Sequence, residues 1–549
     1  MGKELPEGRQ SAREFRLCRP VYGACARRNG VCAHARQGIE VRRAKDELYK
    51  LPGGRQIHEV ALRLPQGVLA VVGSRPACGQ SFYSINHKNK PVKNMIKRRE
   101  FIKGAAAFSS LMFLPSCATK ATKRANGKLH VAVVGAGGRG RAAVNEVASS
   151  PDAKLVAFCD VDDARAAETY KKFPKVPRFR DYRVMLDKMD GDIDGVAVCT
   201  PDHMHYPIAA WAIAKGKHIY CEKPLTRTVW EARELRRLAD EAGVFTQMGN
   251  QGHTNEGWRV IREWYDAGII GEIEDIYIWT NRPIWPQGGL TMPAGEPIPP
   301  TLDYPLWLGV APYQPYNKAI LPFKWRGLRN YGTGAAGDMA CHFMDVPYSA
   351  FDLGFPSKIS ANSTPFSDYD WPNKASCKMV FDNKRGKGGK IRLHWFDGGR
   401  KPKEIKRVPQ EFLTDSRNMN CTFIVGTKNT ILTNEYGQGT TIFPRLTMRE
   451  YAKSGKLPAK TIARSTNPGN PHKEWVKACV DGVNPMGNFN YAAPFTEMVL
   501  LSMVAILNPD KELIYNPTKM CFPKTPEADK YLRSLYEYKA EFLPSKIRI

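Results

Sequence analysis

Long hydrophobic runs are missing from this sequence of 549 residues, in which no apolar stretch approaches the 18 residues that a membrane-spanning helix needs. Cysteines at metal-binding spacing are missing too, because the 13 cysteines form no C-x-x-C pair and no disulfide framework. Even the regular spacing of Cys18, Cys25 and Cys32 is too wide for a zinc motif. We therefore predict no metal site and no transmembrane helix.

A long basic tract is also absent, although the formal net charge is +28. Residues 1–94 carry 18 Lys and Arg against 7 Asp and Glu, and the rest of the excess is spread over the chain. Dispersed charge does not form the basic stripe that nucleic-acid binding needs. We predict a basic globular protein with no nucleic-acid partner, and its length predicts two domains with appendages.

Glycines cluster directly after a strand-like run, where Val131 to Val134 leads into the segment GAGGRG at residues 135–140. In this G-x-G-x-x-G spacing, Gly135 permits a tight turn, Gly137 permits close approach to a pyrophosphate, and Gly140 lets the next helix pack on the strand. The first-turn N–H groups of that helix would face the anion. We predict a dinucleotide site that includes Gly135, Gly137, Gly138, Arg139 and Gly140.

An acidic residue, Asp160, directly follows the second strand-like run, which covers residues 154–159. An acid about 20 residues after the glycine motif hydrogen-bonds an adenosine ribose hydroxyl and repels a 2′-phosphate, which favours NAD over NADP. Asp160 could instead be a turn or N-cap residue, and Asp162 and Asp163 leave the assignment open by a position or two.

Strand and helix patterns go on alternating, with strand-like runs at residues 193–199, 218–221 and 244–248. The best helix covers residues 228–242, where Thr228 and Glu231 form a capping box and Gly243 follows. This alternation predicts a doubly wound parallel sheet of the Rossmann type. The motifs TPDHMH at 200–205 and EKP at 222–224 end two of its strands, so both should face the cofactor.

An export signal is indicated between residues 95 and 117. Arg98 and Arg99 begin an R-R-x-F-I-K pattern, a short apolar stretch runs to Leu114, and Cys117 follows in a lipobox-like position. This resembles a twin-arginine signal, although Pro115 is atypical of a lipobox. Because such a signal must be N-terminal, we interpret residues 1–94 as a non-native or disordered extension.

Together with G337-D-M-A-C-H342, these motifs resemble the Gfo/Idh/MocA oxidoreductases, which include glucose–fructose oxidoreductase and inositol dehydrogenases. The resemblance runs from about residue 128 to about residue 509. It implies a second, α+β domain with a mostly antiparallel open sheet, and strand-like runs at 273–280, 378–381, 390–395 and 422–425 agree. The expected segments are an extension (1–94), a signal (95–117), a linker (118–127), an NAD-binding domain (128–250) and a substrate domain (251–549).

Asp338 and His342 lie four residues apart in a helix-like run, so the carboxylate could orient the imidazole. The resemblance implies that His342 is the general base, Asp338 its partner or a substrate ligand, and Lys223 the active-site lysine. It also implies that further residues bind the cofactor, namely Thr200, Pro201, His205 and Glu222. Asp338 could instead favour a helix N-terminus, and His342 could be a core histidine.

Mixed aromatic and polar side chains predict a sugar site, because indole faces stack on sugar rings while Arg and Asn bind hydroxyls. A buried aromatic cluster is the alternative. The candidates are Asn281, Arg282, Trp285, Trp325 and Arg326.

We expect an exported, periplasmic or lipid-anchored oxidoreductase that acts on a sugar, cyclitol or glycoside, recycles its NAD internally and forms a homo-oligomer. An NAD-dependent glycoside hydrolase that works by oxidation, elimination and reduction is one alternative. A non-catalytic sugar-binding lipoprotein is the other.

Overall fold

The computed structural model describes residues 59–63, 69–73 and 127–545 of the chain. The chain divides into two units, residues 1–114 and 115–549. In the first unit, β1 (Glu59–Arg63) pairs antiparallel with β2 (Leu69–Gly73). The predicted signal at 95–117, with Cys117, and the other predictions for residues 1–126 lie outside the described residues.

The second unit begins with a parallel sheet of six strands in the order β5-β4-β3-β6-β7-β8. Every pairing in it is parallel, and the order reverses between β3 and β6, as in a doubly wound fold. This confirms the predicted Rossmann sheet. Its strands are β3 (Leu129–Val134), β4 (Ala153–Cys159), β5 (Arg178–Phe179), β6 (Gly195–Val198), β7 (His218–Glu222) and β8 (Thr246–Gly249).

Helices cover both faces of this sheet, which explains why β6 and β7 are buried along their whole length. The core on one face includes side chains of α2 (Gly140–Ala148) and α3 (Asp163–Lys172), and the core on the other includes α4 (Tyr182–Lys188), α5 (His205–Ala214) and α6 (Val229–Ala242). Helix α6 starts and ends as predicted, because Thr228 and Glu231 form the capping box and Gly243 adopts a left-handed φ of 63°.

The second sheet has eight strands in the order β15-β14-β13-β9-β12-β11-β10-β16. All its pairings are antiparallel except that of β12 with β9, so the predicted mostly antiparallel sheet is confirmed. The strands are β9 (Ile273–Trp279), β10 (Lys358–Ser363), β11 (Ala375–Asp382), β12 (Lys390–Phe396), β13 (Cys421–Gly426), β14 (Thr430–Thr433), β15 (Thr441–Phe443) and β16 (Glu512–Leu513).

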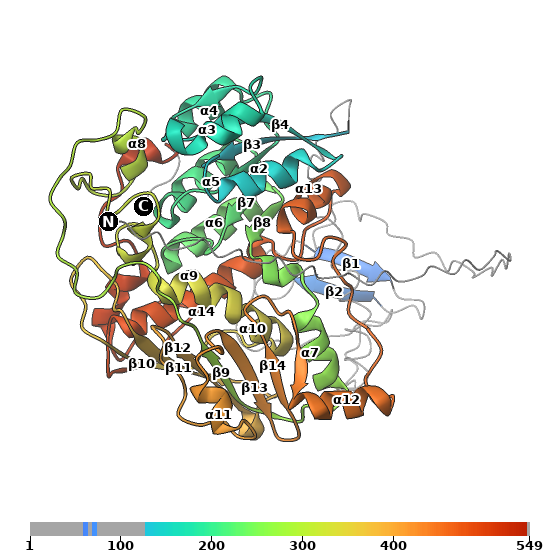
Figure 1. Ribbon diagram of the computed structural model, residues 1–549. Helices are drawn as coiled ribbons and strands as arrows, with labels where there is room; N and C mark the ends of the chain where they lie inside the picture. Colours follow the sequence, from blue (N-terminus) through green and yellow to red (C-terminus); the bar gives the residue numbers. More distant parts are fainter. Residues whose placement is uncertain (1–58, 64–68, 74–126, 546–549) are drawn as a thin grey trace, which may run out of the picture. The chain divides into compact units, whose positions relative to one another are not determined.

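Helix α14 (Phe489–Ile506) joins the two sheets, since it packs on α6 and also on β10 and β11. Figure 1 shows it with α9 between the sheets. By length and composition it could cross a membrane, but 83% of the apolar window is buried inside the protein. The remaining helices are α7 (Gly257–Asp266), α8 (Tyr304–Leu308), α9 (Gly334–Phe343), α10 (Asp345–Phe351), α11 (Gln410–Thr414), α12 (Arg445–Lys453) and α13 (Pro471–Asp481).

Helix α13 returns from the C-terminal part of the chain to the first sheet, where it packs against α2 and β8. Its Trp475 is fully buried, and the ring fills the space that a side chain at Gly195 of β6 would need. The core of the first sheet therefore includes a helix from beyond the boundary predicted at residue 250.

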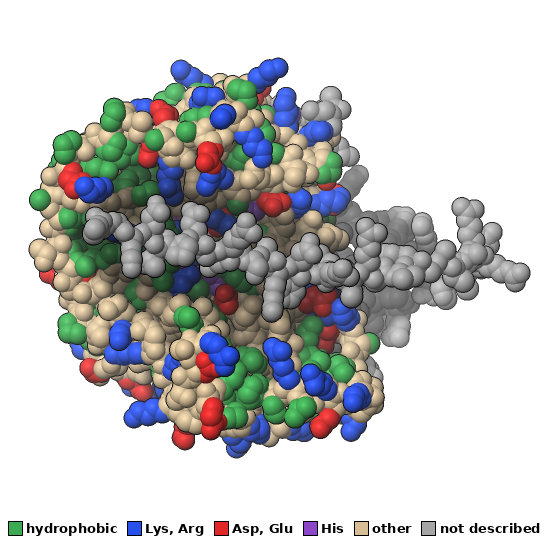
Figure 2. Space-filling view, viewed as in Figure 1, with side chains coloured by type: hydrophobic (Ala, Val, Ile, Leu, Met, Phe, Trp, Pro, Cys, Tyr) green, Lys and Arg blue, Asp and Glu red, His purple; other side chains and the backbone are tan. Residues whose placement is uncertain are grey.

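Charged side chains of both signs are interspersed over the coloured part of the face seen in Figure 2. This distribution agrees with the dispersed charge of the sequence.

Candidate functional site

A cavity of about 500 Å³ opens at the carboxyl ends of the parallel strands. The glycine loop and the ends of β4, β6 and β7 line one side of it, and α9 with the segments 282–285 and 321–326 lines the other. The cavity therefore lies at the switch point of the doubly wound sheet, where such folds bind ligands.

The glycine loop is shaped by close backbone contacts. A Cβ atom at Gly140 would lie 1.7 Å from the carbonyl oxygen of Gly135, so only glycine lets α2 start directly on the loop. A Cβ at Gly137 would lie 2.6 Å from the carbonyl oxygen of Arg165 in α3. The predicted reason for Gly137, close approach to a pyrophosphate, is therefore incomplete, because its nearest constraint is the backbone of α3.

Asp160 lies at the end of β4 and lines the cavity with only 7% of its surface exposed. Its carboxylate accepts hydrogen bonds from the N–H groups of Gly137 (2.8 Å) and Asp162 (3.0 Å). Burial raises the pKa of Asp160 to about 6, against the opposing effect of these bonds. Asp162 caps α3 and Asp163 pairs with Arg180, so each of these neighbours has another role.

The residues present fit a dinucleotide. The hydroxyl of Thr200 lines the cavity, is buried and has no hydrogen-bond partner, although a buried hydroxyl without a partner is costly. Pro201, Gly138 and Arg139 also line the cavity. Together with the N-terminus of α2 and the carboxylate of Asp160, they can hold a pyrophosphate and a ribose.

Lys223, the residue before the Pro224 turn at the end of β7, forms the centre of the polar end of the cavity. Its Nζ donates to the Oδ1 (3.0 Å) and the carbonyl oxygen (2.9 Å) of Asp338 on α9. Burial opposes the charge of Lys223, but Asp338 outweighs it and holds the pKa above its ordinary value of 10.5. Burial likewise opposes the charge of Asp338, whose pKa is nevertheless lowered by Lys223 and Arg326. The two form an ion pair.

His342 is on the same helix and lines the same cavity, but its hydrogen-bond partner differs from the predicted one. Its Nδ1 lies 3.1 Å from Oδ1 of Asn250, whereas the carboxylate of Asp338 binds Lys223. Burial, assisted by the charge of Lys223, holds the pKa of His342 well below 6.5. The imidazole is therefore neutral at neutral pH and able to accept a proton.

Two other predicted cofactor residues hold the motifs together. Both ring nitrogens of His205 face carbonyl oxygens, those of Pro224 and Thr200, each at 2.9 Å. His205 thus clamps the two turns and is not among the cavity-lining residues. Glu222 accepts a 3.0 Å hydrogen bond from Arg139, which ties the glycine loop to β7.

Four of the five predicted sugar-binding residues line the cavity, namely Arg282, Trp285, Trp325 and Arg326. Asn281 does not, and its amide donates to the sulfur of Met419. Arg326 reaches the polar end of the cavity, since its Nε lies 3.4 Å from Oδ1 of Asp338.

Sequence reasoning missed three residues of the site. Asn250 contacts His342, Gln251 lines the cavity with a buried side-chain oxygen that has no partner, and the Tyr436 ring lies edge-on to His342 at 5.2 Å. They come from the segment after β8 and the turn after β14, where no local sequence pattern marks them.

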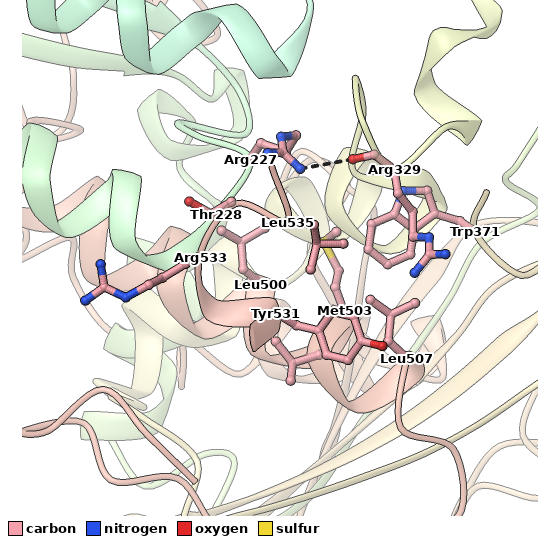
Figure 3. Close-up of a pocket in the computed structure, with 11 residues that line it drawn as sticks. Arg227, Thr228, Arg329, Trp371, Leu500, Met503, Leu507, Tyr531, Arg533 and Leu535 are labelled. Atoms are coloured by element: carbon pink, nitrogen blue, oxygen red, sulfur yellow. Dashed lines mark hydrogen bonds between the residues drawn. The ribbon is translucent and has the colours of Figure 1, made fainter. Parts of the chain in front are cut away.

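A second, smaller cavity of about 40 Å³ lies beside α14 and is lined by Arg227, Arg329 and Arg533. These guanidinium groups do not converge: Figure 3 shows that of Arg533 directed away from the other side chains, and Arg227 already donates to the carbonyl oxygen of Arg329. We assign no ligand to it. Among residues 127–545, no cluster of His, Cys, Asp and Glu could hold a metal ion.

Known families match two parts of the chain. Residues 129–250 match the model described as the NAD-binding Rossmann fold of the Gfo/Idh/MocA oxidoreductase family, and residues 276–365 match its C-terminal alpha/beta domain. The predicted Rossmann fold and NAD as its cofactor are thereby confirmed.

Curated proteins resemble parts of the chain at low sequence identity. D-glucoside 3-dehydrogenase of Escherichia coli (strain K12) is 27% identical over 239 residues, which cover 43% of this chain and 58% of that protein. Myo-inositol 2-dehydrogenase of Thermotoga maritima is 24% identical over 176 residues, which cover 32% and 48%. The chain thus spans about half the length of these relatives.

Among solved structures, the WlbA dehydrogenase from Bordetella pertussis, in complex with NADH and UDP-GlcNAcA, matches with a TM-score of 0.49 at 16% identity. The match covers 71% of this chain and 99% of the other.

Proposed function

We propose that this chain is a Gfo/Idh/MocA oxidoreductase, as its two matched segments support, and that it oxidises a hydroxyl group of a sugar, cyclitol or glycoside with NAD. The observation that carries the proposal is that Lys223, Asp338 and His342 line the same cavity as the glycine loop. Relatives named as dehydrogenases of a glucoside and of an inositol support the substrate class.

NAD, when bound, supplies the acceptor for the hydride that leaves the alcohol carbon. The hydroxyl proton needs a base, and the neutral imidazole of His342 can take it. Lys223 stays protonated beside Asp338, so its ammonium group can stabilise the oxygen as negative charge develops there. The unpartnered oxygen of Gln251 can accept a hydrogen bond from a second hydroxyl.

The test is to assay the purified protein with NAD against glucosides, free sugars and inositols, following absorbance of the reduced nicotinamide and the carbonyl product by mass spectrometry. Formation of a keto-sugar that depends on Lys223 supports the proposal. Unchanged oxidation in a Lys223→Met variant would contradict it.

The redox-neutral hydrolase remains the second candidate. Oxidation at C3, the position in the name of the glucoside relative, would acidify the C2–H and permit elimination of the aglycone, after which water would add and the hydride would return from the reduced cofactor to the C3 carbonyl. Phenol release from an aryl glycoside, without net reduction of NAD, would identify it. The non-catalytic alternative is disfavoured by the assembled Lys223, Asp338 and His342.

We also propose that the protein is exported through the twin-arginine route with its NAD already bound. The pattern beginning at Arg98 and Arg99 supports this, since that route carries folded proteins. N-terminal sequencing of material from the cell envelope tests it, and a start near Cys117 is expected. Native mass spectrometry of the same material would test for a homo-oligomer.

A further inference from the structure

Apolar side chains are exposed at the mouth of the cavity. Ile284 is 61% exposed and Phe323 is 41% exposed, yet both line the cavity. Leu321 and Pro322 continue the same lining. Exposing such groups costs free energy in water, and a large exposed aromatic beside a cavity is a common mark of a binding surface.

This apolar mouth is connected to the catalytic end by direct contacts. The Phe323 ring lies 4.5 Å from the guanidinium carbon of Arg326, and the Nε of Arg326 lies 3.4 Å from Oδ1 of Asp338. Asp338 in turn binds Lys223 at 3.0 Å. One arginine side chain therefore separates the exposed ring from the reacting groups, a distance that a substituent on a sugar ring can span.

Phe323 is the exposed aromatic group at the mouth, and the largely buried Trp285 and Trp325 line the cavity behind it with their N–H donors already engaged. The indole N–H of Trp285 donates to Gln287 (2.8 Å), and that of Trp325 donates to the carbonyl oxygen of Pro322 (3.2 Å). The ring of Phe323 lies at 73° to that of Trp285 with the centroids 5.9 Å apart, so the two form an aromatic corner. A surface of this kind favours a flat apolar group over a further sugar hydroxyl.

We infer that the substrate is a glycoside with a flat apolar aglycone, which lies against Phe323 and Ile284 while the sugar reaches Lys223 and His342. The inference rests on the proposed function, because it presumes that the sugar is oxidised at the polar end. It narrows the substrate class to glycosides of aryl or similar alcohols, and it disfavours free sugars and inositols, which would leave the apolar mouth exposed.

The experiment compares phenyl and methyl glucosides of the same anomeric configuration, for both anomers. Binding is measured by calorimetry on the enzyme loaded with NADH, in which oxidation cannot proceed, and turnover is measured separately with NAD. We expect the phenyl glucoside to bind about 10-fold more tightly and to show a correspondingly higher kcat/KM, as for other apolar pocket contacts.

Two variants test whether Phe323 and Ile284 cause the difference in binding between the phenyl and methyl glucosides. Phe323→Ala and Ile284→Ala should each reduce the phenyl-to-methyl ratio of the dissociation constants several-fold. Ile284→Ala is informative even if loss of the Phe323 ring displaces Arg326. Leu446→Ala is the matched control, because Leu446 is 66% exposed on α12 and does not line the cavity, and it should leave the ratio unchanged.

The outcomes distinguish the aglycone site from the proposed oxidation. If the two glucosides bind equally well and at least one of them is oxidised, the aglycone site is overturned and the proposed function stands. Failure to bind or oxidise any glucoside, sugar or inositol overturns both.

Discussion

The Nδ1 atom of His342 lies 3.1 Å from the side-chain oxygen of Asn250, and the amide nitrogen of Asn250 donates to the carbonyl oxygen of Cys341 at 2.7 Å. The second bond fixes the direction of the amide, so the group facing His342 is an acceptor. The proton of the neutral imidazole must then sit on Nδ1, which leaves the lone pair on Nε2. A general base needs that tautomer.

Asn250→Asp should therefore shift the acidic limb of kcat/KM upward by about 1 to 3 pH units. A carboxylate beside the imidazole favours the imidazolium and raises its pKa, so the base becomes protonated at higher pH. The measurement is a pH profile of kcat/KM at saturating NAD. The matched control is Asn383→Asp, which also loses an amide bond to a buried backbone carbonyl, that of Phe351. An equal shift in both variants would rule out a specific effect on His342.

His342→Ala should lower turnover by about 10² to 10⁴-fold, the usual contribution of a general base. NAD binding should be nearly unchanged, because the side chain belongs to the substrate end of the cavity. Stopped-flow turnover and NAD titration on the same sample measure the two quantities. If turnover on the true substrate stays at the wild-type level, His342 is not the base.

The unsubstituted protein should have a broad pH plateau. The pKa of His342 is held well below 6.5, so the base stays neutral until the pH falls below that value. The pKa of Lys223 is held above 10.5, so the ammonium group is lost only as the pH rises beyond that value. Neither limb should appear between these limits in kcat/KM for the sugar substrate, measured with NAD saturating. A limb near pH 6.5 would point to another titrating group.

Gly137→Val should weaken NAD binding by at least about 10-fold. The new side chain would meet the backbone of Arg165 and displace the start of α3, together with the loop that Asp160 braces. Calorimetric titration with NAD measures the loss, and a circular dichroism spectrum like that of the wild type checks that the fold is kept. Stoichiometric NAD in the variant would show that the loop tolerates the shift.

Turnover should need no added NAD. A protein exported in the folded state can carry NAD from the cytoplasm, and no free pool would replace it outside. The hydride must then return to a second carbonyl or to the same molecule. Extensive desalting followed by an assay with a glucoside, alone and together with a second sugar that carries a carbonyl group, tests this proposal. Turnover that appears only with added NAD, and rises with its concentration, would indicate an ordinary dissociable dehydrogenase.

The sequence predicted the parts of this protein that are encoded locally. The capping box of Thr228 and Glu231, the glycine loop and the placement of Asp338 and His342 on one helix each depend on residues a few positions apart. Such patterns carry their own stereochemistry, so they could be interpreted without the fold.

Partners from distant segments could not be predicted in the same way. The i, i+4 spacing made Asp338 a reasonable partner for His342, but Lys223, 115 residues away, binds that carboxylate instead. Asn250 approaches His342 only because the turn after β8 docks on α9, and Asn281 lies outside the cavity although its neighbour Arg282 lines it. Tertiary packing decides such pairs, and no spacing rule encodes it.

The return of α13 to the first sheet affects the order in which the protein can mature. The ribosome makes β3 to β8 first, yet Trp475, which closes the core over Tyr220 and Gly195, is made more than 200 residues after β8 ends. Until then, one face of the nucleotide domain has a gap where an indole belongs. A nascent chain or truncated fragment that stops at residue 250 consequently exposes apolar core surface to water, and such surface promotes aggregation.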